Sequence, residues 1–238
     1  PWRPARSICV RWRLVFLVAS GLLCASCGPI SKLPPLASEE VEAERRKQQV
    51  DHIRDYFDQR RRLNNVAFRI RTANHRDCKN RSVQIGLEAG TVPSLPRKFR
   101  SYSHEALSVS WTRATVLSVA ETSPAATGGI RPGDHLLTFN NEAVPGSETA
   151  EWISRFVRDN GERPIRVLVH HDGVDEMRTV TRVIACAIPI ELITDSSLNA
   201  FTTGEKIVVH SSILRVARTD AQLALVLQLP VLVRAREV

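Results

Sequence analysis

Aromatic residues and N-terminal acidic residues are the scarce features of this 238-residue sequence. Phe, Trp and Tyr together make up 5 % of the chain, too few to predict a stacking surface for nucleic acid. No acidic residue precedes Glu39, whereas residues 1–26 carry four of the 33 basic residues. Removing that segment would halve the formal charge of +8. The basic character is therefore partly a property of the N-terminus, and no nucleic-acid partner is expected.

The apolar run near the N-terminus is short. Arg11 and Arg13 precede the mainly apolar residues 14–23, which would extend about 15 Å as a helix against a bilayer core of about 30 Å. A basic segment followed by a short apolar run is typical of a signal peptide. We assign residues 1–26 to that signal peptide.

The residues that follow, Cys24-Ala25-Ser26-Cys27, resemble the lipobox of bacterial lipoproteins. The resemblance implies acylation of Cys27 and a lipidated tether over residues 27–37. It also implies attachment to the membrane through a lipid anchor in the bacterial cell envelope, at the periplasmic face of the outer membrane. A plain signal peptide with incidental cysteines is the alternative.

Residues 38–78 predict a helical segment. Ser38 followed by two acidic residues is a plausible helix start. Apolar residues then recur at helical spacing, at Val50, Ile53, Phe57, Leu63, Val66 and Ile70. The pattern fits one long helix, or two helices with a break near Asn64 and Asn65, packed on the rest of the protein. A coiled-coil dimer and a membrane-surface helix are the alternatives, and the basic run 60–62 predicts a solvated face.

The most specific pattern of the chain lies at residues 115–140. Residues 115–119 alternate as a half-buried strand does. Ser123-Pro124 is a helix start with a capping residue and a proline at the first position. Gly129 and the sequence Pro132-Gly133-Asp134 then predict a helix exit and a tight turn before a new strand. This arrangement resembles the core of PDZ domains, especially those of bacterial envelope proteases.

The flanking segments extend the PDZ-like module to residues 79–186. Residues 147–160 predict its second helix, and 165–169 and 178–183 predict closing strands around a turn. The resemblance implies that the module binds the C-termini of peptides or proteins by β-addition. The implied peptide-binding residues are Ile85, Gly86, Leu87, Ala150 and Ile153. Residues 88–114 would be an insertion, which could lie partly over the groove.

The segment 187–238 carries a second resemblance, to the CAAX-protease and HtpX-like zinc metallopeptidases (family M forty-eight). It rests on residues 197–209 and on Asp220-Ala221-Gln222-Leu223-Ala224, where Thr219 and Gln222 also fit a helix capping box. In that family a hairpin borders the substrate cleft and precedes a His-Glu-x-x-His helix that binds zinc. The resemblance places Asn199, Ala200 and Phe201 at the cleft edge.

The decisive motif is missing. The family pattern would place His, Glu and His at 229, 230 and 233, where this chain has Leu, Pro and Val. Pro230 is also expected to disrupt the helix. We therefore expect no catalytic residue, no metal ligand and no cofactor in this chain, although the intact family uses zinc. A frameshift before the motif is the favoured explanation, and a catalytically inactive relative is the alternative.

Cys78 and Cys186 flank the PDZ-like module almost symmetrically. In an oxidising periplasm they are expected to form a disulfide that clamps the two ends of an inserted domain. Two buried free thiols are the alternative.

These observations define an α+β protein. A PDZ-like β-barrel or sandwich with two helices is inserted in an incomplete helical metallopeptidase-like domain, formed by residues 38–78 and 187–238. The resemblances imply a cell-envelope zinc metalloendopeptidase whose PDZ module captures substrate chain ends, and this chain is expected to be inactive because the zinc motif is absent. A non-enzymatic PDZ adaptor lipoprotein is the first alternative, and a structural envelope protein with an occluded groove is the second.

Overall fold

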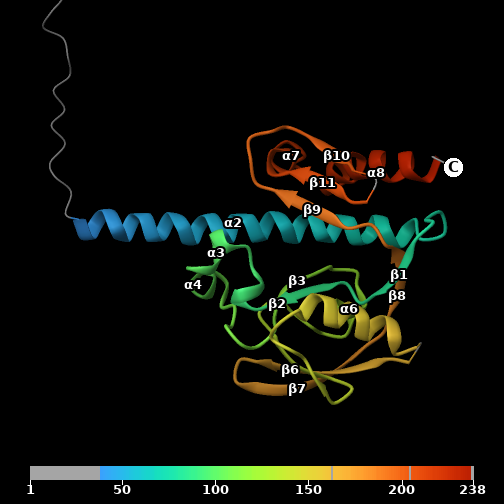
Figure 1. Cartoon of the computed structure of the whole chain (residues 1–238), viewed down its shortest axis with the longest axis horizontal. Helices are drawn as coiled ribbons and strands as arrows, with labels where there is room; N and C mark the ends of the chain where they lie inside the picture. Colours follow the sequence, from blue (N-terminus) through green and yellow to red (C-terminus); the bar gives the residue numbers. More distant parts are fainter. Residues whose placement is uncertain (1–37, 162, 204, 237–238) are drawn as a thin grey trace, which may run out of the picture. The chain divides into compact units, whose positions relative to one another are not determined.

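The computed structural model describes residues 38–161, 163–203 and 205–236, with side chains as far as Gln228. The signal peptide, the tether and Cys27 lie outside the described residues. Residues from Arg45 onward form one compact unit (Figure 1). None of the helices among the described residues combines the length and hydropathy that crossing a bilayer requires.

Helix α2 (Ser38–Ala73) is continuous. The break considered near Asn64 and Asn65 is absent, because both side chains are used in contacts with the PDZ-like module. The Asn65 side-chain oxygen accepts a hydrogen bond from the Glu121 amide at 2.9 Å, and the Asn64 amide group donates to the Ser118 hydroxyl at 3.5 Å. Polar residues that favour helix ends in isolation are thus held within the helix by tertiary partners.

The PDZ-like module is built on an antiparallel sheet with the strand order β2-β3-β4-β6-β7, and β5 pairs with β4 (Figure 1). A short helix follows β3, and a longer helix follows β5. The strands are β2 (Leu87–Gly90), β3 (Thr115–Val119), β4 (His135–Phe139), β5 (Glu142–Ala143), β6 (Ile165–His171) and β7 (Val174–Val180), and the helices are α5 (Pro124–Thr127) and α6 (Thr149–Asp159). This is the mixed α and β architecture expected from the sequence.

The turns of the module form where the sequence predicts them. The Ser123 hydroxyl accepts a hydrogen bond from the Ala126 amide and caps α5, with Pro124 at the first helical position. Gly129 leaves that helix at a φ of 82°. Asn140 and Asn141, with φ of 49° and 72°, turn the hairpin between β4 and β5, as left-handed residues do in two-residue hairpins.

Aromatic side chains fix α6 on the sheet. Trp152 and Phe156 of α6 contact Phe139 of β4, with ring centroids 5.7 and 5.5 Å apart. Phe139 is fully buried in an apolar cluster that also contains Ile153 and Val157 of α6. The orientation of α6 about its own axis is therefore set by the side of the helix that meets β4.

The insertion between β2 and β3 packs on α2. It forms η1 (Val92–Ser94), α3 (Arg97–Arg100) and α4 (Ser103–Leu107). Phe99 is buried with its ring centroid 4.5 Å from that of Tyr56 of α2. The insertion thus shares the apolar cluster of α2, and its buried residues are used there rather than over the groove.

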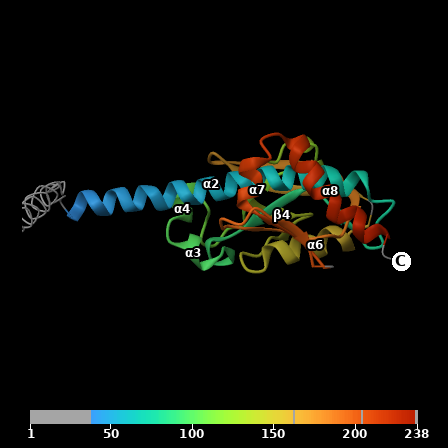
Figure 2. The same ribbon diagram turned by 90° about the horizontal axis from the view of Figure 1, so that it is seen from above.

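The C-terminal part is a small sheet with two helices. Strands β9 (Ile190–Ile193) and β11 (Ile207–His210) are parallel, and β10 (Ala200–Thr202) pairs antiparallel with β11. The helices are α7 (Ser211–Val216) and α8 (Asp220–Arg236). Both are labelled in Figure 2, which views the molecule from above. Thr219 and Gln222 exchange hydrogen bonds at 3.1 and 3.2 Å, which forms the expected capping box.

The expected disruption of this last helix at Pro230 is wrong, because α8 continues to Arg236. Proline removes one backbone donor and costs about 3 kcal/mol in a helix interior. It does not remove the hydrogen bonds made by the turns before and after it.

The beginning and end of the PDZ-like module lie side by side. Strand β1 (Arg81–Gln84) pairs antiparallel with β8 (Val183–Cys186), and Arg81 lies opposite Cys186. The expected disulfide joins Cys78 to Cys186, with Cα atoms 5.6 Å apart. The disulfide thus joins the segment that follows α2 to the end of β8, next to the strand pair that closes the module.

Removing this disulfide should weaken the fold. It links residues 108 positions apart, and loss of such a native bond typically costs about 2–5 kcal/mol because the unfolded chain gains freedom. We expect the Cys78→Ala/Cys186→Ala variant to unfold at a lower urea concentration than the oxidised protein. Adding reductant should lower the urea midpoint of the unmodified protein but not that of the double variant. Equal midpoints for both proteins, with and without reductant, would contradict the prediction.

Candidate peptide-binding groove

Strand β2 is an edge of its sheet. It pairs with β3 on one side, with Leu87 opposite Val119, and no described strand pairs with its other side. An edge strand carries backbone donors and acceptors that can pair with an added chain. The free side of β2 is therefore the position at which an extended peptide could continue the sheet.

The loop before β2 has the geometry of an anion site. The carbonyl of Ile85 accepts a hydrogen bond from the Ala125 amide, and that of Gly86 accepts from the Ala120 amide, both at 2.9 Å. Each planar trans peptide points its N–H opposite to its carbonyl. The amides of Gly86 and Leu87 therefore point away from α5 and β3. Convergent amides of this kind bind anions such as a chain-terminal carboxylate.

Glycine is required at position 86 for two reasons. Its φ is +79°, which an L side chain rarely adopts. A Cβ at this position would lie 2.2 Å from the Ser123 Cβ and 2.9 Å from Cε2 of Phe68. The close approach of the loop to α5 and α2, which aligns its carbonyls, is thus possible only without a side chain.

Helix α6 forms one wall beside β1 and β2. Successive residues of a helix are separated by about 100°, so Ala150 lies on the flank opposite to Trp152, which faces β4. Ala150 is exposed, whereas Ile153 is buried in the module core. Of the predicted peptide-binding residues, Gly86, Leu87 and Ala150 lie along this side, and Ile85 and Ile153 support them from the core.

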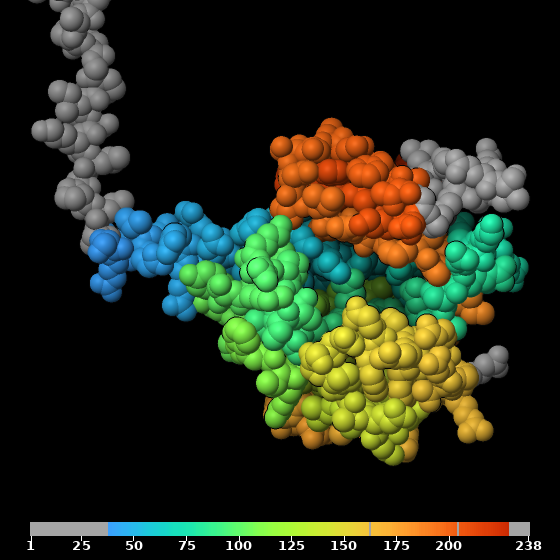
Figure 3. Space-filling model, viewed as in Figure 1, coloured from blue at the N-terminus to red at the C-terminus, as the bar shows by residue number. Residues whose placement is uncertain are grey.

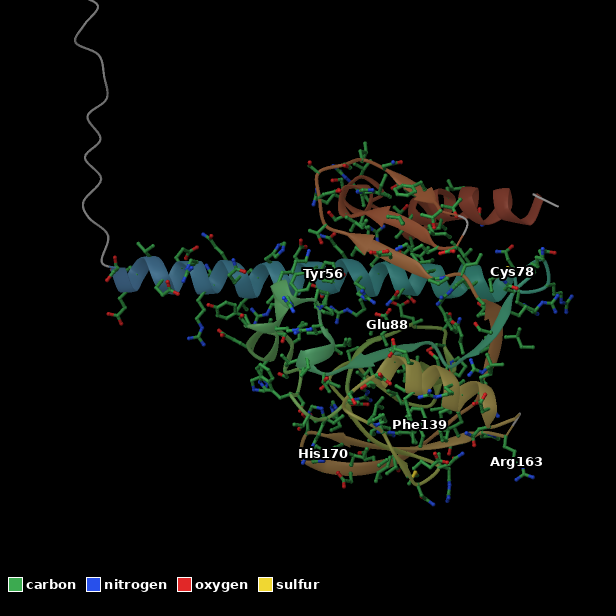
Figure 4. The ribbon with its side chains drawn as sticks, viewed as in Figure 1. Tyr56, Cys78, Glu88, Phe139, Arg163 and His170 are labelled. Carbon is green, nitrogen blue, oxygen red and sulfur yellow. A yellow bond between two sulfur atoms is a disulfide. The ribbon has the colours of Figure 1, made fainter. Side chains whose placement is uncertain are left out.

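Helix α2 also lies beside β2, and an ion pair joins the two elements. The guanidinium of Arg60 donates two hydrogen bonds to the Glu88 carboxylate of β2, at 2.9 and 3.1 Å. Burial opposes the charge of Arg60, but the attraction and hydrogen bonds of Glu88 outweigh burial and raise the pKa of Arg60. Figure 4 shows Glu88 on the side of β2 that faces α2.

The space-filling view shows a hollow on one face of the molecule. Figure 3 shows the hollow between the yellow segment that includes α6 and the orange C-terminal part, with the blue-green half of α2 behind it. The contacts of α6 with β2 and of Arg60 with Glu88 place these two helices beside β2.

The charge pair was missed by sequence reasoning. The basic run 60–62 predicted a solvated face, but Arg60 binds Glu88, and Arg62 binds Asp220 and the carbonyls of Leu214 and Ala217. Arg61 forms its ion pair locally, with Asp58 one turn earlier in α2. Only the Arg61–Asp58 pair, at a spacing of three residues, could be read from the sequence, because the partners of Arg60 and Arg62 are distant along the chain.

The predicted cleft-edge residues lie in the C-terminal sheet and not beside β2. Asn199 accepts a hydrogen bond from the His210 amide at 3.1 Å, Ala200 is half-buried, and Phe201 is 40 % exposed. The nearby Asp195 carboxylate contacts the His210 ring nitrogen at 2.7 Å, and this hydrogen bond lowers the pKa of Asp195.

The described residues do not fit a zinc site. No group of three or more His, Cys, Asp or Glu side chains among them could hold a metal ion. The positions that the peptidase resemblance assigns to ligands and base are Leu229, Pro230 and Val233, none of which can bind zinc.

Comparison with known proteins identifies the central module. Residues 115–170 match the PDZ domain family. A search of curated proteins found no match to this chain. Several solved structures are similar to part of it. They include the HtrA3 PDZ domain bound to a phage-derived ligand, the HtrA-type protease AlgW with a decapeptide, and a serine endoprotease from Yersinia pestis.

The similarity is confined to part of each protein. The HtrA3 domain is 20 % identical with a TM-score of 0.33, over 44 % of this chain and 88 % of that chain. AlgW is 23 % identical with a TM-score of 0.34, over 44 % of this chain and 30 % of that chain. The Yersinia pestis protease is 25 % identical with a TM-score of 0.27, over 31 % of this chain and 29 % of that chain.

Replacing the loop glycine should test the geometry of this site. In Gly86→Ala, a left-handed alanine costs about 1–2 kcal/mol, and overlap with Ser123 adds about 1–3 kcal/mol. Gly173→Ala is the matched control, because Gly173 has a φ of +83° but nothing within 4 Å of an added Cβ. Urea unfolding should therefore show the larger loss for Gly86→Ala. Equal losses would mean that the loop does not approach α5 as described.

Proposed function

We propose that the chain binds the free carboxyl ends of extended peptides or proteins by β-addition to β2. The observation that supports this function is the pair of Gly86 and Leu87 amides, which point toward the free edge of β2. The carbonyls of the same two peptide units, those of Ile85 and Gly86, accept hydrogen bonds from the Ala125 and Ala120 amides, so the Gly86 and Leu87 amides are oriented before a ligand arrives. Such preorganisation reduces the entropy lost on binding.

The orientation of the peptide follows from the position of the loop. The loop precedes β2, so a carboxylate bound there can continue along the edge only if the peptide runs antiparallel to β2. The last peptide residue then lies beside Leu87. Side chains alternate across a strand, and Leu87 packs toward the module core. The last side chain is therefore directed toward α6 and should be apolar.

The position of the insertion favours an open groove over an occluded one. The buried residues of η1, α3 and α4, including Val92 and Phe99, belong to the apolar cluster of α2. They are not used to cover β2. A peptide-binding adaptor is thus better supported than a purely structural protein.

We further propose that this binding takes place in the bacterial cell envelope. The basic N-terminus, the apolar residues 14–23 and the lipobox-like Cys27 support export and a lipid anchor at the outer membrane. The disulfide between Cys78 and Cys186 is consistent with an oxidising compartment.

A relationship to envelope zinc endopeptidases is the second candidate. It is supported by the β10–β11 hairpin followed by the capped helix α8, which is the order that the peptidase resemblance implies. The residues at 229, 230 and 233 do not fit the metal. We therefore assign no hydrolytic step to this chain and propose that peptide capture is the function it retains.

The peptide-binding proposal can be tested with one peptide in two forms. A peptide that ends in valine with a free carboxylate should bind the full chain, and its C-terminal amide should bind about tenfold or more weakly. The reason is that charge-assisted hydrogen bonds contribute about 1.5–3 kcal/mol. Fluorescence anisotropy of the labelled peptide measures the affinities of both forms. Equal affinities for acid and amide would contradict carboxylate binding.

The groove itself can be tested with two tryptophan variants of α6. Ala150→Trp places a bulky ring on the flank that faces β2 and should weaken binding of the free-acid peptide. Arg155→Trp is the matched control, because Arg155 is also exposed on α6 but lies away from that flank. Equal affinities for the two variants would show that the peptide does not lie between α6 and β2.

The absence of zinc ligands gives a separate test. Chain purified from zinc-supplemented cells should contain well under one zinc per molecule by atomic absorption, because Leu229, Pro230 and Val233 supply no ligand. Chelator treatment should leave the urea unfolding curve unchanged. One tightly bound zinc per chain would overturn this interpretation of the C-terminal part.

A further inference from the structure

Arg71 of α2 is a cation whose hydrogen-bonding capacity is largely unused. It is half-buried, and its only hydrogen bond among the described residues is from Nη1 to the Ile188 carbonyl, at a long 3.4 Å. Its Nε is buried and has no partner. A guanidinium offers five donors, and leaving a buried donor without an acceptor costs about 1–3 kcal/mol.

The position of Arg71 is beside the proposed groove. Arg60, Asn64 and Phe68 contact Glu88, Ser118 and the Gly86 loop respectively. Arg71 follows Phe68 by three residues and so lies on the same face of α2. Long helical side chains lean toward the helix N-terminus, which directs the guanidinium back toward the level of the loop. Glu88 is close enough to affect its charge.

Among the described residues of this face, no carboxylate forms an ion pair with Arg71. Both oxygens of Glu88 accept hydrogen bonds from Arg60. Burial lowers the pKa of Arg71, and the attraction of Glu88 only partly offsets burial. Glu88 forms its ion pair with Arg60, whereas no ion pair of Arg71 is present among the described residues. The nearby Arg69 is not equivalent, because it pairs with Asp220 at 2.8 Å.

The peptide register determines which side chain meets Arg71. With the last residue beside Leu87, the penultimate residue lies beside Glu88. Directly opposed residues of an antiparallel pair share one face of the sheet. Since Glu88 faces α2, the penultimate side chain also faces α2. In an isolated PDZ-like module that side chain would face solvent. In this protein α2 lies on that side, with the guanidinium of Arg71.

We propose that the groove selects peptides whose penultimate residue is acidic, with Arg71 donating to its carboxylate. The proposal rests on the proposed function, because it takes the peptide register from that binding mode. A lysine at the same position would face the like charge of Arg71, and the charge of Glu88 is already neutralised by Arg60. A glutamine would accept hydrogen bonds but would not neutralise the charge. The order of affinity is therefore Glu, then Gln, then Lys.

Three peptides that differ only at the penultimate position test this order. Each ends in valine with a free carboxylate and carries Glu, Gln or Lys before it, and binding to the full chain is measured by calorimetry. We expect the Glu peptide to bind about tenfold more tightly than the Gln peptide. In Arg71→Gln this ratio should fall to near one while the affinity for the Gln peptide is kept. Arg71→Lys should retain part of the preference, and Arg69→Gln should retain all of it.

Each other outcome has a defined meaning. A ratio near one in the unmodified chain, or a full preference in Arg71→Gln, overturns the selection by Arg71. If Arg71→Gln instead weakens all free-acid peptides equally and leaves the amidated peptide unaffected, Arg71 binds the terminal carboxylate and the inference is wrong. If no free-acid peptide binds at all, the proposed function fails and this inference fails with it. Thermal unfolding of each variant shows that the compared proteins are folded.

Discussion

The burial of the apolar stripe of α2 is the interaction on which the rest of the structure depends. Ile53, Leu63 and Val66 of this helix are almost fully buried in one cluster. That cluster also contains residues of the insertion, such as Phe99, and of the C-terminal sheet, such as Val209. The insertion and the C-terminal sheet are distant in sequence, and they bury this apolar surface away from water only when α2 lies between them. The PDZ-like module has its own core, but its surroundings are defined by this helix.

The same helix gives the edge of β2 a chemical character that an isolated module would lack. The face of α2 that meets the module carries Arg60, Asn64, Phe68 and Arg71. The first three contact β2, β3 and the loop before β2 respectively. The loop at Gly86 is thereby fixed from two sides, by α5 and by α2. The proposed carboxylate site is therefore placed beside a surface with unequal charges. In the proposed binding mode, peptide specificity depends on tertiary packing outside the module that carries the loop.

Local features of the fold were predictable because their causes lie within a few residues. The cap at Ser123, the left-handed residues at Asn140 and Asn141, and the capping box at Thr219 all depend on neighbouring backbone geometry. Such signals have the same meaning in any context that forms the element. The continuity of α2 through Asn64 and of α8 through Pro230 was not predictable in this way. Intrinsic preference argues for an interruption at both places, and the folded chain overrides it.

The sequence alone specified the PDZ-like module, its glycine-dependent loop and the lack of zinc-binding side chains at 229, 230 and 233, because residue type and spacing decide these properties. Only the tertiary structure decided what surrounds the loop. The pairing of Arg60 with Glu88 spans 28 positions and that of Arg62 with Asp220 spans 158. A run of three arginines looks the same whether its partners are water or carboxylates. Arg71 remains underpaired for the same physical reason, because the packing of α2 against β2 and Ile188 determines which acceptors come within reach.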